Sequence, residues 1–409
     1  MKYLRPQNAS RHTTYQQHVK EANIKQIFDL VRNGKCGSRA ELVRAMKLSA
    51  TSISVLVEEL SERGLISEVG PQQTFQPGRR PISLHFNQDA RQIVVFRLTR
   101  YGVRYDLLDL SANILESLYA PFESAVFNGA DSGDKYPELF LDILLNRARK
   151  FDPERAAVIG ICSAGIYSDA QKALLIQLAM NTSISEDALR AFQRRIGAPL
   201  LVANRTMCMA YAEKKQLDGV LPDSPNARFM LFVRMNESIR GAIIDNGSLY
   251  AGPYNLPAEV GHFCVELDGR PCSCGSKGCL ERYVSMDMIL RDAQDACAAA
   301  GVPGPKSIEE LSESFLDHPV VAKSLERSAE ILGSGLYTAI CALGIREVVL
   351  GGAASLLGEG FLRSVYHSIL RRGELMVHYL DLRYARVGDD SDSIGLAQYF
   401  LDQLFTVTM

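Results

Sequence analysis

The sequence predicts a mixed α/β protein in two parts, a small N-terminal winged helix-turn-helix and a larger α/β body of two similar lobes. Three segments with helical spacing of apolar residues lie between residues 19 and 62, and two short strand patterns follow them. In the body, three apolar strand segments precede an alternation of helices and strands, and this arrangement occurs twice. We therefore expect a head over residues 1–88 and a body over residues 89–409.

The bulk composition is that of a soluble globular protein. A chain of 409 residues is too long for one ordinary hydrophobic core, which favours two or three domains. Hydrophobic residues make up 47% and charged residues 22% of the chain, as in typical globular proteins. No apolar run is long enough to span a membrane, and the N-terminus lacks the apolar segment of a signal peptide. We expect a cytoplasmic protein with no membrane insertion.

Charge is distributed unevenly along the chain, although the net charge is only −2. Residues 1–90 contain 13 Lys and Arg against 8 Asp and Glu, whereas the remaining chain contains 32 against 39. A basic head on an acidic body indicates that the head binds a polyanion such as nucleic acid.

The head begins with three predicted helices. Apolar residues at helical spacing predict the first helix over residues 19–31. Ser38 is the predicted N-cap of the second helix, with Glu41 at the capping-box position, and Ser49 is the predicted N-cap of the third. The buried stripe of the third helix is expected to consist of Ile53, Leu56, Val57 and Leu60.

Two predicted strands, residues 65–69 and 81–86, follow the helices and flank a polar loop. Three helices and a hairpin predict a winged helix-turn-helix, in which the third helix enters the major groove of double-stranded operator DNA. A small protein-binding domain without DNA contact is the alternative. The candidate DNA-binding residues are Ser38, Arg39, Ser49, Thr51, Ser52, Ser54, Arg79 and Arg80.

The body shows its repeated pattern in the order of its predicted elements. The first half is expected to contain strands 93–98, 103–110 and 114–119, helix 136–150, strand 157–162, helix 185–196, strand 199–202 and a helix from residue 206. The second half is expected to contain strands 229–234, 239–245 and 248–250, helices between residues 286 and 344, and strand 347–350.

A compact cluster of metal-ligand residues interrupts the second half. Cys272, Cys274 and Cys279 fall within eight residues, and His262 lies ten residues before the first. Thiolates and an imidazole form the Cys₃His donor set of a closed structural site for one Zn²⁺ per chain, over residues 262–279. Disulfides are the alternative, but the lack of a signal peptide and the scattering of the other cysteines favour a reducing compartment.

The same segment carries a family resemblance. The pattern E-x-G-H, followed by C-x-C-G-x-x-G-C-x-E up to Glu281, resembles the signature of the ROK family, which groups sugar-responsive repressors with sugar kinases. In the head, residues 38–60 and the motif G-R-R-P resemble the ROK repressors, whereas ROK sugar kinases lack a head. The resemblance implies an actin-like, ribonuclease H-like duplicated ATPase fold in the body, with a ligand cleft between its lobes.

The resemblance also implies an effector site. Glu259, His262, Glu281, Asn181 and Asn204 correspond to residues that hold sugar hydroxyls, and His262 would also bind the zinc. Carboxylates suit adjacent hydroxyl groups, and a metal ligand is oriented through its second ring nitrogen. Without the resemblance, the glutamates would be solvated loop residues and each asparagine a turn or cap residue.

The motifs for phosphoryl transfer are altered. Where the family kinases carry E-N-D, with aspartate as the general base, this chain reads Ala203-Asn204-Arg205, and arginine cannot accept a proton. The phosphate loops D-x-G-G-T and G-T-G-I-G are replaced by residues 97–101 and 235–239, which lack the glycines that let backbone N–H groups approach an anion. We expect a sensor and not a sugar kinase.

Arg205 raises two hypotheses about the effector. A guanidinium suits bidentate contact with phosphate or carboxylate, so the effector could be a sugar phosphate or a sugar acid that contacts Arg205. Alternatively, Arg205 pairs with an internal carboxylate such as Glu237 and closes a cleft that no longer supports phosphoryl transfer.

The combined interpretation is a transcriptional regulator, a repressor of carbohydrate genes controlled by a sugar or sugar phosphate. It should form a homodimer or homotetramer, since palindromic operators match two-fold proteins. One departure concerns Ala50 and Val55, which occupy outward positions where the repressors often carry arginine. The alternative is a regulator controlled by a protein partner that docks on the body.

Overall fold

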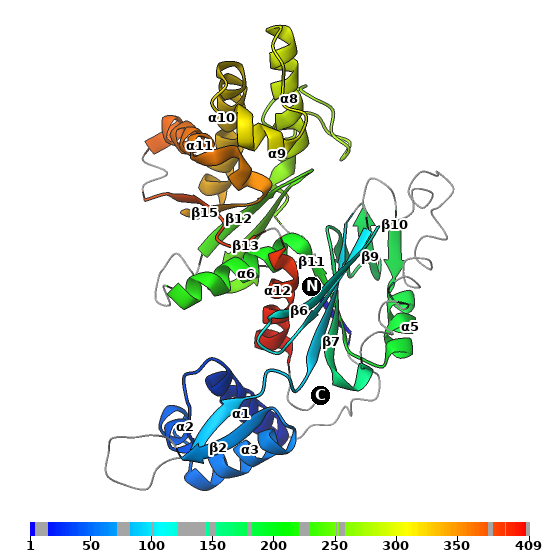
Figure 1. The fold of residues 1–409 in the computed structure, drawn as a ribbon, viewed down its shortest axis with the longest axis vertical. Coiled ribbons are helices and arrows are strands. Elements are labelled where there is room, and N and C mark those ends of the chain that lie inside the picture. Colours follow the sequence, from blue (N-terminus) through cyan, green and yellow to red (C-terminus); the bar gives the residue numbers. More distant parts are fainter. Residues whose placement is uncertain are drawn as a thin grey trace. The chain divides into compact units, whose positions relative to one another are not determined.

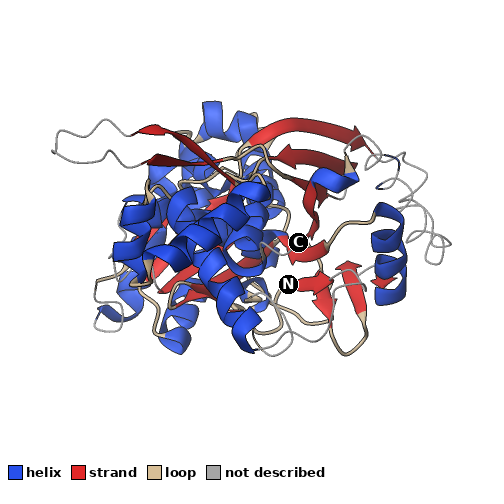
Figure 2. Cartoon of the chain, turned by 90° about the horizontal axis from the view of Figure 1, so that it is seen from below, coloured by secondary structure: helices blue, strands red, loops and turns tan. Residues whose placement is uncertain are grey.

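The computed structural model describes residues 1–4, 15–71, 82–99, 102–121, 144, 146, 152–177, 182–220, 229–250, 252, 258–374, 379–388 and 390–405 (Figure 1). The chain divides into two compact units. The N-terminal unit comprises residues 2–161, 187–201 and 397–409, and the C-terminal unit comprises residues 1, 162–186 and 202–396. Figure 2 shows helices and strands throughout the described chain, as expected for an α/β protein.

Three helices and a two-stranded antiparallel sheet open the N-terminal unit. The helices are α1 (Tyr15–Arg32), α2 (Arg39–Met46) and α3 (Ala50–Glu62), and the strands are β2 (Ile66–Pro71) and β3 (Ile82–Phe86). The predicted N-caps are confirmed, because Ser38 Oγ accepts a hydrogen bond from Glu41 N at 3.3 Å and Ser49 Oγ accepts one from Ser52 N at 3.0 Å. The fully buried residues between these elements include Ile24, Ile27, Phe28, Leu42, Ile53, Val57 and Leu60.

A six-stranded sheet contains the other strands of this unit, in the order β1-β11-β7-β4-β5-β6. Its strands are β1 (Lys2–Leu4), β4 (Gln92–Leu98), β5 (Gly102–Leu108), β6 (Ile114–Pro121), β7 (Ala156–Ser163) and β11 (Leu200–Asn204). The predicted meander is confirmed, since β4, β5 and β6 pair in antiparallel fashion. Helix α5 (Glu186–Ile196) contacts the edge strand β1, where the side-chain amide of Gln193 donates to Leu4 O.

The C-terminal unit is built on a five-stranded sheet with the order β14-β13-β12-β15-β16. The strands are β12 (Phe229–Met235), β13 (Ile239–Asp245), β14 (Ser248–Tyr250), β15 (Glu347–Gly352) and β16 (Asp381–Tyr384). The first three strands are antiparallel, and β12, β15 and β16 are parallel to one another. Apart from β1, the two sheets share one strand order, which agrees with the predicted repeat.

Helices cover both faces of this sheet because successive side chains of a strand point to opposite faces. Met230 and Phe232 of β12 pack against α6 (Arg205–Val220), whereas Leu231 and Val233 pack in the cluster on the other face. That second cluster includes residues of α8 (Met286–Ala299), α10 (Pro319–Leu343) and α11 (Gly358–Gly373). Figure 1 shows α6 on one side of the sheet and α10 and α11 on the other.

Smaller elements complete the described chain. A three-stranded antiparallel sheet consists of β8 (Ile166–Ser168), β9 (Ala173–Gln177) and β10 (Thr182–Ser185). Helix α12 (Ser391–Tyr399) continues into a π-helical turn, Phe400–Leu404. The predicted helix 136–150 lies outside the described residues except for positions 144 and 146, which are helical. Among the described helices, none is long and apolar enough to cross a membrane.

Candidate metal centre and effector site

The loop between β14 and α8 folds back on itself through two glycines. Gly275 and Gly278 have φ values of +90° and +70°, in the left-handed region that favours glycine. A Cβ atom on Gly278 would lie 1.7 Å from Glu266 O, so only glycine fits there. The turn is closed by a hydrogen bond from Cys272 N to Ser276 O at 2.9 Å. This turn therefore brings the cysteines on both sides of it together.

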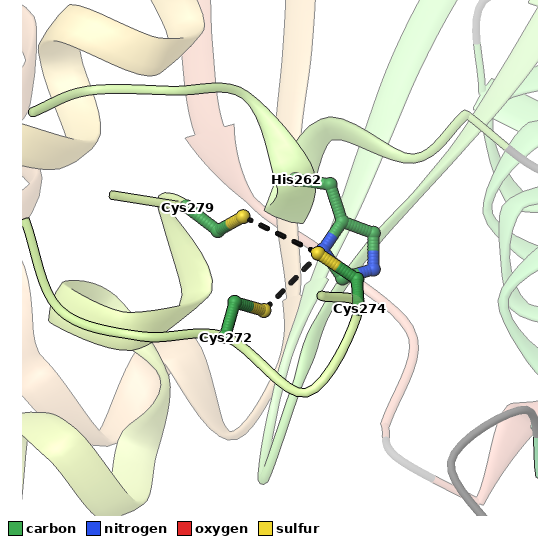
Figure 3. Close-up of side chains that lie close together, drawn as sticks. All are labelled: His262, Cys272, Cys274 and Cys279. Atoms are coloured by element: carbon green, nitrogen blue, oxygen red, sulfur yellow. Dashed lines mark hydrogen bonds between the residues drawn. The ribbon is translucent and has the colours of Figure 1, made fainter. Parts of the chain in front are cut away.

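The four predicted zinc ligands lie together in one cluster (Figure 3). The ligand atoms of His262, Cys272, Cys274 and Cys279 all lie within 4.8 Å of one another. Cys274 Sγ is 3.6 Å from Cys279 Sγ, and Cys272 Sγ is 3.8 Å from His262 Nδ1. Zn–S bonds of about 2.3 Å in a tetrahedral site separate the sulfurs by about 3.8 Å. The donor set and its spacing fit Zn²⁺.

The thiols of the cluster differ in acidity. Burial, together with hydrogen bonds to Cys274 and Cys272, raises the pKa of Cys279 to about 12. Burial also raises the pKa of Cys272, whereas a hydrogen bond from the Ser276 backbone lowers the pKa of Cys274. Zinc binds thiolates, so a bound divalent cation supplies the charge that lets these thiols ionise together.

Of the residues assigned to sugar hydroxyls by resemblance, Glu259 and Glu281 lie beside the imidazole of His262. Its Nδ1 faces Cys272, and its Nε2 lies 3.7 Å from Glu259 Oε2. Glu281, the first residue of α7 (Glu281–Val284), faces the sulfur cluster and accepts a hydrogen bond from Cys272 Sγ at 3.2 Å. A metal on Nδ1 would therefore leave Nε2 facing Glu259 on the other side of the ring.

Arg240, which was not among the predicted site residues, lies beside Glu259 and His262. Arg240 Nη1 donates a hydrogen bond to Glu259 Oε2 and lies 3.2 Å from His262 Nε2. A sequence signal for it existed, because Arg240 directly follows residues 235–239, the segment where the family kinases carry a phosphate loop.

Asn204 and Arg205 are both bonded within the C-terminal unit. The Asn204 amide donates to Gly165 O at 2.9 Å, and its Oδ1 accepts from Thr206 N at 2.9 Å, so the side chain caps helix α6. Arg205 Nε donates to Asp392 Oδ2 at 2.6 Å, and both side chains are buried. This geometry favours the internal-pair hypothesis for Arg205, with Asp392 as the partner where Glu237 was suggested. Asn181 lies outside the described residues.

The altered second phosphate loop packs against the turn that follows β15. Asn236 Oδ1 accepts a hydrogen bond from Ala353 N at 2.9 Å. The same oxygen lies close to Gly352, where an added Cβ would be 2.3 Å from it. The Asn236 side chain, from the altered second phosphate loop, therefore fills the space beside the Gly351-Gly352 turn. In the altered first loop, positions 100 and 101 lie outside the described residues.

The candidate DNA-binding residues fall into four groups. Ser38 is 1% exposed, so its hydroxyl serves as a helix cap. Arg39 is tied to its neighbours, with Nε donating to Glu68 at 2.7 Å and Nη1 donating to Ser54 O at 3.2 Å. The exposed residues at the start of α3 are Ser49, Thr51 and Ser52, with Ser54 partly exposed. Arg79 and Arg80 lie outside the described residues.

Comparison with known families gives a match to the body. The sequence model of the ROK family matches residues 136–403. The xylose repressor of Bacillus subtilis (strain 168) is 28% identical over 286 residues, which cover 68% of this chain and 70% of the repressor. The xylose repressor of Caldicellulosiruptor bescii is 25% identical over 402 residues, which cover 94% of this chain and 97% of the repressor.

Comparison with solved structures extends the likeness to the fold. A ROK family transcriptional regulator, described as a homologue of the Escherichia coli MLC protein, superposes with a TM-score of 0.75 at 22% sequence identity. The match covers 95% of this chain and 99% of that regulator. The described chain therefore shares the fold of that protein.

Proposed function

The chain belongs to the ROK family, and from that premise we propose that it is a DNA-binding transcriptional repressor whose body responds to a carbohydrate. The head, residues 1–88, is the DNA-binding part, a winged helix-turn-helix. The C-terminal unit contains the carbohydrate site, formed by Glu259, His262 and Glu281 beside a structural Zn²⁺.

One observation carries this proposal. The polar side chains suited to hydroxyl groups are clustered at His262, whereas Asn236, in the altered second phosphate loop, fills the space beside the Gly351-Gly352 turn. A site that binds a carbohydrate without a nucleotide senses it and does not phosphorylate it. The xylose repressor of Caldicellulosiruptor bescii matches 94% of the chain, a share that includes most of the head.

Helix α3 is the proposed recognition helix. Its first turn exposes Thr51 and Ser52, and Val55 is 54% exposed on the next turn. Hydroxyl groups contact several bases, and an exposed valine suits the methyl group of thymine. The wing arginines, Arg79 and Arg80, are proposed to contact phosphates. We propose a homodimer or homotetramer on a two-fold symmetric operator, acting in the cytoplasm where that DNA lies.

The zinc is proposed as a structural ion held by His262, Cys272, Cys274 and Cys279. When bound, it cross-links the two ends of the loop and holds the His262 ring through Nδ1. The ring then presents Nε2 beside Glu259. Metal binding and carbohydrate binding are therefore coupled through one side chain.

DNA selection tests the proposal. The full chain is incubated with random-sequence duplexes, and enriched sequences are measured over a range of salt concentrations. We expect a specific site, with a salt slope that falls by about two in an Arg79→Ala, Arg80→Ala double variant, since each phosphate contact contributes about one. Arg371 and Arg372, an exposed adjacent pair on α11, provide the matched control double variant. Failure to enrich any sequence would overturn the assignment.

Carbohydrates are then added to the complex of protein and selected DNA. A sugar that lowers the DNA affinity identifies the effector class. If the protein binds DNA but no carbohydrate changes its affinity, control by a docked protein partner becomes the better explanation.

A further inference from the structure

Arg240 is brought to the effector site by two close backbone approaches in the C-terminal unit. Gly241 N donates to Ala258 O at 2.7 Å, and a Cβ on Gly241 would lie 2.7 Å from that oxygen. A Cβ on Gly261 would lie 2.2 Å from Ile239 O. Only glycines allow this spacing, which presses residues 258–262 against β13. Arg240 lies between Ile239 and Gly241, and its side chain is therefore placed beside Glu259 and His262.

The guanidinium of Arg240 lies against both residues that would contact the carbohydrate. Its Nη1 donates to Glu259 Oε2 and lies 3.2 Å from His262 Nε2. A guanidinium presents a planar fork of N–H donors and has no acceptor. Glu259 would offer an acceptor and His262 a ring nitrogen to sugar hydroxyls. Both groups lie beside the permanent positive charge of Arg240.

The group remains open to solvent. The side chains of Arg240, Glu259 and His262 are 23%, 30% and 25% exposed. A small molecule that reaches Glu259 and His262 therefore also meets the guanidinium. This differs from Arg205, which is 7% exposed and bound to a fully buried Asp392.

We propose that Arg240 determines effector specificity and selects a carbohydrate that carries an anionic group, a carboxylate or a phosphate. This inference rests on the proposed carbohydrate site. A neutral sugar competes with Arg240 for Glu259 Oε2, and it offers the guanidinium no anion in return. An anionic sugar gives the guanidinium a bidentate partner and frees Glu259 to accept hydroxyl hydrogen bonds.

Matched ligands test the proposal on the full, zinc-loaded protein by calorimetry. The probes are glucose, gluconate and glucose 6-phosphate, with xylose and xylonate as a second set; inorganic phosphate and acetate test the anion alone. The wild type should bind an anionic member about 10-fold or more tightly than its neutral counterpart, as expected for a charge-assisted hydrogen bond. Comparison of gluconate with glucose 6-phosphate decides between carboxylate and phosphate.

Substitution of Arg240 should remove this preference. Arg240→Ala should weaken the anionic ligands about 10-fold and leave or improve the neutral ones, while Arg240→Lys keeps part of the preference. Arg371→Ala, an exposed arginine of the same unit, serves as the control. Zinc content and circular dichroism verify the fold, and Arg240→Gln replaces the alanine variant if that variant does not fold.

Several outcomes would overturn the inference. Equal or tighter binding of the neutral member by the wild type excludes it, and so does a preference for anions that survives in Arg240→Ala. Absence of binding by every probe also counts against it. A neutral sugar that binds the protein and lowers its affinity for the operator would leave the proposed function intact. It would exclude the role of Arg240, so the two failures are distinguishable.

Discussion

Arg32, the last residue of helix α1, donates through Nη2 to Asp402 Oδ1 in the C-terminal π-helical turn, across 370 residues of sequence. The two side chains are 9% and 15% exposed. Beside them, the ring of Phe28 packs against the ring of Phe405, with centroids 5.0 Å apart. Within the N-terminal unit, residues 400–405 are therefore part of the surface that contacts the first helix of the head.

This contact predicts that the C-terminus stabilises the head. A double-mutant cycle with Arg32→Ala, Asp402→Ala and both together should give a coupling free energy of about 1–3 kcal/mol, because the hydrogen bond is charged and partly buried. Denaturant unfolding measures the free energy, and amide hydrogen exchange shows whether α1 loses protection. The exposed pair Arg371–Glu330, with side chains 65% and 57% exposed, is the matched control and should couple by about 1 kcal/mol or less. Equal coupling in the two cycles would contradict the prediction.

The sequence could predict elements whose signals are local. Ser38 and Ser49 mark helix starts because a cap bonds to a backbone N–H three residues later. The zinc cluster was predictable for a similar reason, since Cys272 to Cys279 span one turn. The repeat of strand triplets was also visible, because apolar runs at regular spacing indicate strands directly.

Long-range pairings could not be predicted. The three residues of β1 are too few to show a period, yet the strand joins the sheet edge beside β11. The sequence gives no local signal for strands β8 to β10, because their pairing with one another decides their conformation. Arg205 pairs with Asp392, which is 187 residues away in the sequence, and no pattern near Arg205 indicates that partner.

Metal loss should destabilise the C-terminal unit. Metal analysis of dialysed, unfolded protein should give about one zinc per chain, as a closed four-ligand site requires. Cys274→Ser should lower both the zinc content and the melting temperature. Cys264→Ser is the matched control, because Cys264 is an exposed cysteine of the same loop outside the four-residue cluster. Folded, DNA-binding protein without zinc would exclude the site.

The protein should not bind ATP or transfer a phosphoryl group to sugar. Loss of a general base alone would lower the rate by about 10²–10⁴-fold and leave measurable turnover. Here the Asn236 side chain also occupies the space beside Gly352, so the nucleotide itself should not bind. Calorimetry with Mg²⁺ and ATP should give no signal, under conditions where the same sample binds its DNA. Micromolar binding of ATP would show that Asn236 does not block the site.

A buried triad in the C-terminal unit predicts a specific pH dependence. Arg383 donates to Glu213 at 2.5 Å and to Glu347 at 2.7 Å, and both carboxylates are almost fully buried. Glu213 accepts two further hydrogen bonds, from the backbone N–H groups of Arg386 and Val387. Glu347 Oε2 has no hydrogen-bond partner among the described residues. Burial therefore raises the pKa of Glu347 above its usual value, although Arg383 opposes the shift.

The direction of that shift decides how stability changes with pH. A raised pKa in the folded state means that the folded protein binds the proton of Glu347 more tightly than the unfolded chain does. As the pH rises above the ordinary value of 4.5, the wild type loses stability until the pH passes the raised pKa. Glu347→Gln removes this titration. We expect the stability of Glu347→Gln relative to the wild type to increase from pH 4.5 upward and then to become constant, as measured by denaturant unfolding at each pH.

Glu213→Gln is the matched control, because it changes the other carboxylate that binds Arg383. It should destabilise the protein by about 3–5 kcal/mol over the whole range, since it breaks a buried ion pair and weakens the acceptor for two backbone N–H groups. A stability difference between Glu347→Gln and the wild type that does not change with pH would show that Glu347 is ionised alike in the folded and unfolded chains. The attraction of Arg383 would then offset the effect of burial on Glu347 completely.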